Sequence, residues 1–226
     1  MYLAMKEAID IARKIKESNF SLDWEKKESE CSRWELEIEP HISNFESKHH
    51  LTCDFIVKSF IRDYFDFNRH RLVGNFKTNS IGLNKGRLKS YAWATIFKVK
   101  DGIEKTPYKN SPQLVLSINE NGIATSFSYG KLIEKNNSSI RIFQEDTNIQ
   151  NYILNNFADS IIYDRGNKVT KRVEEFDRNV LFDSWYEDTQ LTTIIGQKQI
   201  RKNFKVNLIE NMDKLMPVFL KAIEHF

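Results

Sequence analysis

The sequence has few of the residues that mark extracellular, metal-binding or membrane-spanning proteins. Its 226 residues include only two cysteines, Cys31 and Cys53, which lie far apart and lack metal-ligand spacing. This usage favours reduced thiols in a cytoplasmic protein and argues against a zinc site. No apolar run approaches the roughly 18 residues of a membrane span. Residues 1–15 mix charged and apolar side chains, so they do not resemble a signal peptide.

The common catalytic motifs are also missing. The chain contains no GxxxxGK followed by Ser or Thr, no GxSxG and no HExxH. Asp101 precedes Glu104 and Lys105, but these last two are adjacent and Pro107 favours a loop, which does not fit the metal-binding strand of restriction nucleases. We therefore expect a protein that is not an enzyme and that needs no cofactor or metal. A metal-dependent nuclease remains the catalytic alternative.

Residue spacing predicts helices towards both ends of the chain and strands in its middle. Apolar residues recur at helical intervals in residues 2–16, 51–67, 148–157 and 203–226. The last of these helices has the broadest apolar stripe, and Pro217 should kink or divide it. Alternating or β-branched segments predict strands at residues 34–38, 90–99, 114–118, 123–129, 179–185 and 192–195. Residues 21–47 are otherwise polar and irregular.

The clearest turn signal is Asn121-Gly122, between the apolar segments 114–118 and 123–129. Asn and Gly both tolerate positive φ, so this pair favours a β-hairpin. The second arm alternates, with Ile123, Thr125, Phe127 and Tyr129 on one face. These elements predict an α+β fold: a small, mostly antiparallel sheet with a central hairpin, flanked by helices, with a long C-terminal helix.

Positive charge is concentrated more than the composition suggests. Between residues 77 and 105, seven basic residues and two acids give a charge of +5, against +3 for the whole chain. The first cluster combines Lys77 with a glycine-containing basic loop, Lys85-Gly86-Arg87-Leu88-Lys89. Its backbone amides and cations suit contacts with phosphates. A second cluster without intervening acids is Lys198, Arg201, Lys202 and Lys205.

Each cluster is equally consistent with an ordinary solvated surface. What favours nucleic-acid binding in the first cluster is the neighbourhood of Tyr91 and Trp93. Bases stack on aromatic rings while cations hold the backbone. A tryptophan on a strand is also typical of a hydrophobic core, so Trp93 has both interpretations.

The segment from Gly86 to Phe97 resembles the glycine loop and following Pro-Trp strand in the N-terminal domain of McrB-type modification-dependent (type IV) restriction systems. Ser111-Pro112 resembles the start of that family's next strand, Tyr129-Gly130 is similar to the end of its hairpin, and residues 204–226 are similar to its closing helix. The resemblance covers residues 75–226. Residues 1–74 match only as a helical lead-in, and we expect the chain to form one DNA-binding domain.

The resemblance implies binding of double-stranded DNA that carries methylated or hydroxymethylated cytosine, with the base flipped into an aromatic pocket. It also implies two partners: an AAA+ GTPase motor, in the same or a separate chain, and an McrC-like nuclease. Carried over by position, Trp93 matches the pocket tryptophan and Val115 an aliphatic base contact. The complete expected pocket is Trp93, Tyr91, Val115, Tyr108 and Tyr129. The expected backbone contacts are Lys77, Lys85, Gly86, Arg87 and Lys89.

The sequence departs from the family at three positions. Ser111 stands where the family has an aromatic residue before proline, and either Tyr108 or Tyr91 could supply the missing pocket wall. Ala92 replaces the proline before the tryptophan, and the loop aromatic that wedges into the duplex falls near Lys85 or Leu83. A different modification, or unmodified DNA, is therefore open. The alternative class is a protein-interaction or assembly domain whose basic face is incidental.

Overall fold

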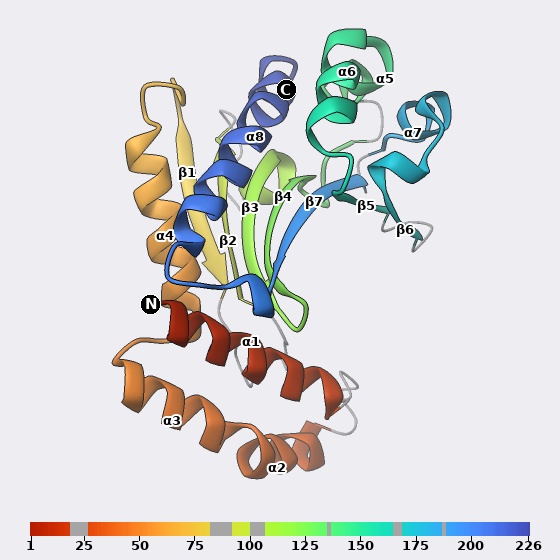
Figure 1. Cartoon of the computed structure of the whole chain (residues 1–226). Coiled ribbons are helices and arrows are strands. Elements are labelled where there is room, and N and C mark those ends of the chain that lie inside the picture. The colour runs from red at the N-terminus through yellow and green to blue at the C-terminus, as the bar shows by residue number, and fades with distance from the viewer. Residues whose placement is uncertain (19–26, 82–91, 100–106, 135–136, 165–168, 187–188) are drawn as a thin grey trace.

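The computed structural model describes residues 1–18, 27–81, 92–99, 107–134, 137–164, 169–186 and 189–226. Within these ranges the chain has an α+β fold, with one seven-stranded antiparallel sheet, packed helices and a long helix near the C-terminus (Figure 1). The expected fold class is confirmed, although the sheet has more strands than the sequence predicted. Their spatial order is β1-β2-β3-β4-β7-β5-β6. The strands are β1 (Phe76–Ile81), β2 (Ala92–Lys98), β3 (Pro112–Asn119), β4 (Gly122–Tyr129), β5 (Ile161–Asp164), β6 (Val169–Arg172) and β7 (Thr189–Gly196).

The predicted β3–β4 hairpin forms at the centre of the sheet, but its turn lies one residue earlier than expected, with Glu120 and Asn121 in the turn and Gly122 as the first residue of β4. Asn119 pairs with Gly122 across the turn, and the Asn119 side chain accepts a hydrogen bond from the Asn121 amide at 2.9 Å. Gly122 has φ of 142°, and a Cβ there would lie 2.3 Å from the carbonyl oxygen of Ile195. Only glycine fits both the backbone conformation and the close approach of β7.

Three helices cover one face of this sheet: α4 (Cys53–Phe67), α8 (Phe204–Glu224) and α1 (Tyr2–Glu17). Figure 1 shows α8 running diagonally in front of the sheet, with α4 beside β1. Helix α8 packs on β3 and β4, and α4 packs on β1 and β2. The strands present to these helices a continuous set of buried residues: Ala92, Ala94, Ile96, Leu114, Leu116, Ile118, Ile123 and Phe127. Burial of each large aliphatic side chain contributes about 1.5–3 kcal/mol, so this face fixes the register of the sheet.

Helix α8 remains a single helix through Pro217, so this residue does not divide it as the sequence suggested. Its apolar stripe is buried against the sheet, with Leu208, Met212, Leu215 and Phe219 inaccessible to solvent. Because a proline in a helix interior removes one backbone hydrogen bond, burial of this stripe has to offset that loss.

The prediction of a strand at residues 34–38 is wrong, because these residues lie in and after helix α2 (Lys27–Glu37). Trp34 and Ile38 are both buried, whereas Leu36 is 79% exposed. Positions i and i+4 share one face of a helix, and i+2 points away, so a pattern of three alternating apolar residues fits either structure. Helix α3 (Glu39–His49) follows, although the polar sequence of residues 21–47 predicts irregular structure there.

The prediction of a strand at residues 179–185 is also wrong, because helix α7 (Arg178–Asp183) occupies it. The Asp177 side chain accepts hydrogen bonds from the amides of Asn179 and Val180 at 2.9 and 3.4 Å, which caps the helix. The predicted helix at 148–157 is confirmed as α6 (Thr147–Asn156), and α5 (Ser138–Glu145) precedes it without having been predicted.

The three strands that were not predicted have sequences with only a weak strand pattern. Strand β1 is at the edge of the sheet and is largely polar, while β5 and β6 have only four residues each. Edge strands bury less of their surface, so alternation of apolar and polar residues is less marked in them.

Among the helices of the described ranges, none is both long and apolar enough to cross a bilayer.

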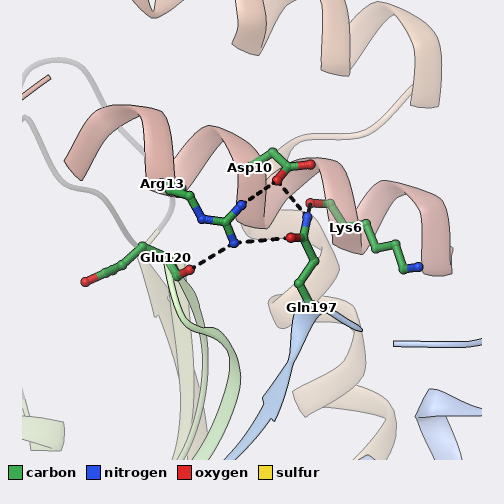
Figure 2. Close-up of polar contacts among 5 residues, drawn as sticks. All are labelled: Lys6, Asp10, Arg13, Glu120 and Gln197. Atoms are coloured by element: carbon green, nitrogen blue, oxygen red, sulfur yellow. Dashed lines mark hydrogen bonds and ion pairs between the residues drawn. The ribbon is translucent and has the colours of Figure 1, made fainter. Parts of the chain in front are cut away.

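Polar contacts link α1 to the turn between β3 and β4 and to the residues that follow β7 (Figure 2). Arg13 donates to the carbonyl oxygen of Glu120 in the hairpin turn at 3.4 Å and to the Gln197 side chain at 3.2 Å. Gln197, in the short helix η5 (Gln197–Gln199) after β7, donates to Asp10 at 2.6 Å and to the backbone of Lys6 at 3.2 Å. These contacts hold the chain that follows β7 against α1.

Replacing Gln197 with alanine should therefore destabilise the fold. The variant loses two donated hydrogen bonds and one accepted bond, and we expect its free energy of unfolding in urea to fall by about 1–2 kcal/mol. Lys198→Ala is the matched control, because Lys198 is exposed and makes no contact of this kind among the described residues. If both variants unfold at the same urea concentration as the native chain, this network does not stabilise the docking of α1.

Candidate nucleic-acid interface

Strand β2 presents Trp93, Thr95 and Phe97 on the face of the sheet opposite α4. Successive side chains of a strand point to opposite faces, and the alternate residues Ala92, Ala94 and Ile96 lie in the helix-covered core. The cross-strand partners in β3 are, in the same order, Ser117, Val115 and Gln113. Val115 therefore lies on the same face as Trp93, diagonally across the strand pair.

An aromatic cluster forms on this face where the short helix η3 (Pro107–Asn110) approaches β2. The Tyr108 ring lies 5.7 Å from the Trp93 ring and 6.1 Å from the Phe97 ring, between centroids, at tilts of 57° and 65°. Such tilted and edge-to-face pairs are favourable arrangements of aromatic rings. Phe97 is buried, whereas Trp93 and Tyr108 keep part of their surface exposed. Solvent can therefore reach two rings of the cluster.

The position of Tyr108 is determined by contacts between η3 and the end of the hairpin. The Gln113 side-chain amide donates to the Tyr108 carbonyl oxygen, and the Leu132 amide donates to that of Lys109 at 2.8 Å. Gly130 lies directly against η3: a Cβ on it would be 2.4 Å from backbone atoms of both Tyr108 and Lys109. The missing side chain of Gly130 allows this contact, and the contact brings Tyr108 to Trp93.

Two lysines flank the aromatic cluster. Lys77 in β1 is the direct cross-strand partner of Phe97 and is exposed. The ammonium group of Lys109 lies 6.0 Å from the centroid of the Tyr108 ring. Within the described part of the chain, neither lysine forms an ion pair. Both can therefore contact an anion without first breaking an internal salt bridge.

Of the expected pocket, the structure brings together Trp93, Tyr108 and Val115, but not Tyr129. Tyr129 belongs to the helix-covered face, where it is 2% exposed and its hydroxyl donates to the carbonyl oxygen of Ser139 at 2.7 Å. Burial raises the pKa of the Tyr129 phenol well above its usual value, as expected for a core residue. Tyr129 therefore stabilises the core and does not line the surface that carries Trp93.

Tyr91, Lys85, Gly86, Arg87 and Lys89 lie outside the described residues. The strand residues that flank this segment in the sequence, Ile81 and Ala92, are described. Ile81, the last residue of β1, pairs directly with Trp93, and Ala92 immediately precedes it. Among the residues expected to contact the DNA backbone, Lys77 is therefore the one that lies in the described part of the chain.

The sequence reasoning missed Phe97 and Thr95. Both share the two-residue period of Trp93 in β2, so the strand prediction already implied that they project on the same face. Thr95 is fully buried, and its hydroxyl donates to the carbonyl oxygen of Leu114 at 3.1 Å. Ser111, which stands at the family's aromatic position, is also fully buried and bonds to Pro112. Of the two residues predicted to substitute for that aromatic, Tyr108 is in contact with Trp93, and Tyr91 lies outside the described residues.

The chemistry available here suits binding. Partly exposed aromatic rings such as Trp93 and Tyr108 can stack against a base, and the flanking ammonium groups attract phosphate. In the described ranges, no group of three or more His, Cys, Asp or Glu side chains is arranged to hold a metal ion. No protein-family model matches the sequence, and no curated protein is significantly similar to it.

Replacement of Gly130 with alanine should displace η3. The new methyl group would overlap the backbone of η3, and we expect a loss of about 1–3 kcal/mol in the free energy of unfolding and a change in the near-ultraviolet circular dichroism of the Trp93–Tyr108 pair. The matched control is Gly196→Ala, whose Cβ would meet only the Gln199 side chain, at 3.6 Å. Equal behaviour of the two variants would show that η3 does not depend on Gly130.

Proposed function

We propose that this chain is a cytoplasmic DNA-binding module that reads a modified base, methylated or hydroxymethylated cytosine, by flipping it out of the duplex. The observation that carries the proposal is the contact between the partly exposed Trp93 and Tyr108, flanked by Lys77 and Lys109. The resemblance of residues 75–226 to the DNA-binding domain of McrB-type restriction systems supports the same conclusion.

Base flipping suits this surface energetically. Extruding a base from the stack costs a few kcal/mol, and stacking on an aromatic side chain returns about 1–3 kcal/mol per base. Trp93 offers the ring on which the base stacks, and Tyr108, tilted by 57° against it, forms a second wall. Val115 supplies an apolar contact on the same face, which suits the methyl group of a modified cytosine.

A polar group lies where the edge of such a base would be read. Ser117 is the direct cross-strand partner of Trp93 and is partly exposed. Directly paired residues have Cβ atoms about 4.5–5.5 Å apart, so the Ser117 hydroxyl is within reach of a ring stacked on Trp93. A hydroxyl both donates and accepts hydrogen bonds, so Ser117 can pair with the edge of the base.

The phosphate backbone on either side of the base would be held by cations. Lys77 and Lys109 flank the rings, and the basic segment of residues 85–89 lies between β1 and β2 in the sequence. Charge contacts of this type bind any DNA sequence and weaken as salt increases. In this proposal the cations give affinity and the aromatic cluster gives specificity for the modified base.

The module would not act alone. In restriction systems of the type that the sequence resembles, the motor is a GTP-hydrolysing AAA+ domain, and an McrC-like nuclease cleaves the DNA. We propose that these two activities lie outside residues 1–226, in a further domain or in separate chains, because the sequence contains neither a P-loop nor a nuclease motif. This chain would contribute recognition and no catalysis.

A protein-interaction domain is the second candidate, and exposed apolar residues favour it. Val206 and Ile209 lie one helical turn apart on α8 and are 54% and 41% exposed, and Phe55 on α4 is 50% exposed. These residues suit docking of another polypeptide. They lie on helices that cover the opposite face from Trp93, so a protein partner and DNA would use different surfaces.

The substitution Trp93→Ala tests the proposed function. Native protein should bind a duplex with one 5-methylcytosine or 5-hydroxymethylcytosine more tightly than the unmodified duplex, and the variant should lose about 1–3 kcal/mol on the modified duplex only, because stacking is lost. Fluorescence anisotropy with labelled duplexes at low salt measures both affinities. Trp93→Phe, which retains a ring, should recover most of the difference.

Tyr186→Ala is the matched control, because Tyr186 is a 44% exposed aromatic residue outside the cluster. Negligible binding of every duplex by the native protein would reject DNA binding and favour the protein-interaction candidate. Nicking of supercoiled plasmid in magnesium or manganese would contradict the absence of catalysis.

A further inference from the structure

The second basic cluster lies between the end of β7 and the first turn of α8. Its four cations are Lys198, Arg201, Lys202 and Lys205, and all are exposed. No acidic residue occurs among residues 197–205, and none of the four forms an ion pair within the described part of the chain. The Trp93 surface does not include them, since α8 covers the opposite face of the sheet.

Two buried residues within this cluster fix its backbone. Ile200 and Phe204 are 0% and 2% exposed and belong to the core, so the residues between them must project outward. The Phe204 amide donates to the Arg201 carbonyl at 3.0 Å, and the Ile200 amide donates to that of Gln197 at 3.2 Å. Gln197 is itself bound to α1 (Figure 2). A preformed backbone lowers the entropy that a ligand would have to remove on binding.

The helix that follows adds to the positive potential. Helix α8 has no acidic residue in its first turn, so nothing there neutralises the positive end of its dipole. Asp10, which contacts Gln197 next to this cluster, is also paired with Arg13. A fixed surface with four unpaired cations therefore faces solvent at this end of the molecule.

We propose that Lys198, Arg201, Lys202 and Lys205 form a second binding surface for DNA, one that contacts the phosphate backbone without reading its sequence. The inference rests on the proposed function, which makes DNA the relevant polyanion. Arginine and lysine side chains on a fixed backbone bind phosphate in proteins, and the one aromatic residue among residues 197–205, Phe204, is buried and so cannot stack on a base.

The strand register relates the two surfaces. Trp93, Ser117, Ala124 and Ile194 form one row across β2, β3, β4 and β7. Ile194 is therefore three strand spacings from Trp93, on the order of 14 Å, and it precedes Lys198 by four residues. Both surfaces thus belong to the end of the sheet that carries the hairpin turn. In this proposal, the cluster would contact the phosphate backbone of the DNA at a distance from the base that is flipped.

The test is the salt dependence of binding to an unmodified duplex of about 20 base pairs, measured with the complete chain. Each lost phosphate contact lowers the slope of log affinity against log salt by about 0.9. Arg201→Ala with Lys202→Ala should therefore lower the magnitude of the slope by about 1.8. The charge reversal Arg201→Glu with Lys202→Glu should weaken binding further. Lys58→Ala with Arg62→Ala removes the same charge from exposed positions of α4 and should leave the slope unchanged.

The outcomes separate this inference from the proposed function. If the Arg201/Lys202 variant has the slope of the Lys58/Arg62 control, the second surface is rejected, whatever the effect of Trp93→Ala. If Trp93→Ala leaves discrimination unchanged while the Arg201/Lys202 variant loses salt dependence, modified-base reading fails and the second surface stands. Vesicles containing phosphatidylserine provide a further arm: loss of vesicle binding in the Arg201/Lys202 variant, with duplex binding intact, would overturn the assignment to DNA.

Discussion

The two-residue period of strand β2 is the constraint on which the candidate site depends. Ala92, Ala94 and Ile96 are buried beneath the helices, and their burial fixes which side of the strand faces the core. Trp93 and Phe97 are then necessarily on the other side. A slip of one residue would exchange the two sets, placing a tryptophan under α4 and small residues in the aromatic cluster. The same packing that stabilises the sheet therefore defines the surface proposed to receive a base.

A second constraint comes from two glycines, Gly130 and Gly122, at which a side chain would overlap neighbouring backbone. Gly130 lets η3 contact the end of the hairpin, and η3 carries Tyr108 to Trp93. Gly122 lets β7 approach the hairpin turn, after which the chain is held against α1 and enters the second basic cluster. Both proposed DNA-contacting surfaces are thus positioned by contacts of the central hairpin: Gly130 acts at its open end and Gly122 at its turn.

The sequence was informative where a pattern has one physical solution. Asn121-Gly122 and the long stripe of α8 could be predicted because few other structures suit them. The alternation at Trp34 and Ile38 fits a strand or a helix, and only the exposure of Leu36 distinguishes them. The position of Tyr129 could have been predicted correctly. A two-residue hairpin pairs Val115 with Ser126, which places Tyr129 on the other face. The approach of η3 to Trp93 is a tertiary contact that no local pattern of residues 107–110 encodes.

The central claim is that DNA binds against Trp93, and the indole N–H signals of the tryptophans in a heteronuclear NMR titration test it directly. Trp34 and Trp185 are fully buried, whereas Trp93 is partly exposed beside Tyr108, so the indoles report on separate places in the fold. Addition of a duplex with one modified cytosine should shift or broaden the Trp93 signal and leave those of Trp34 and Trp185 in place. DNA binding that leaves the Trp93 signal unchanged would contradict the account.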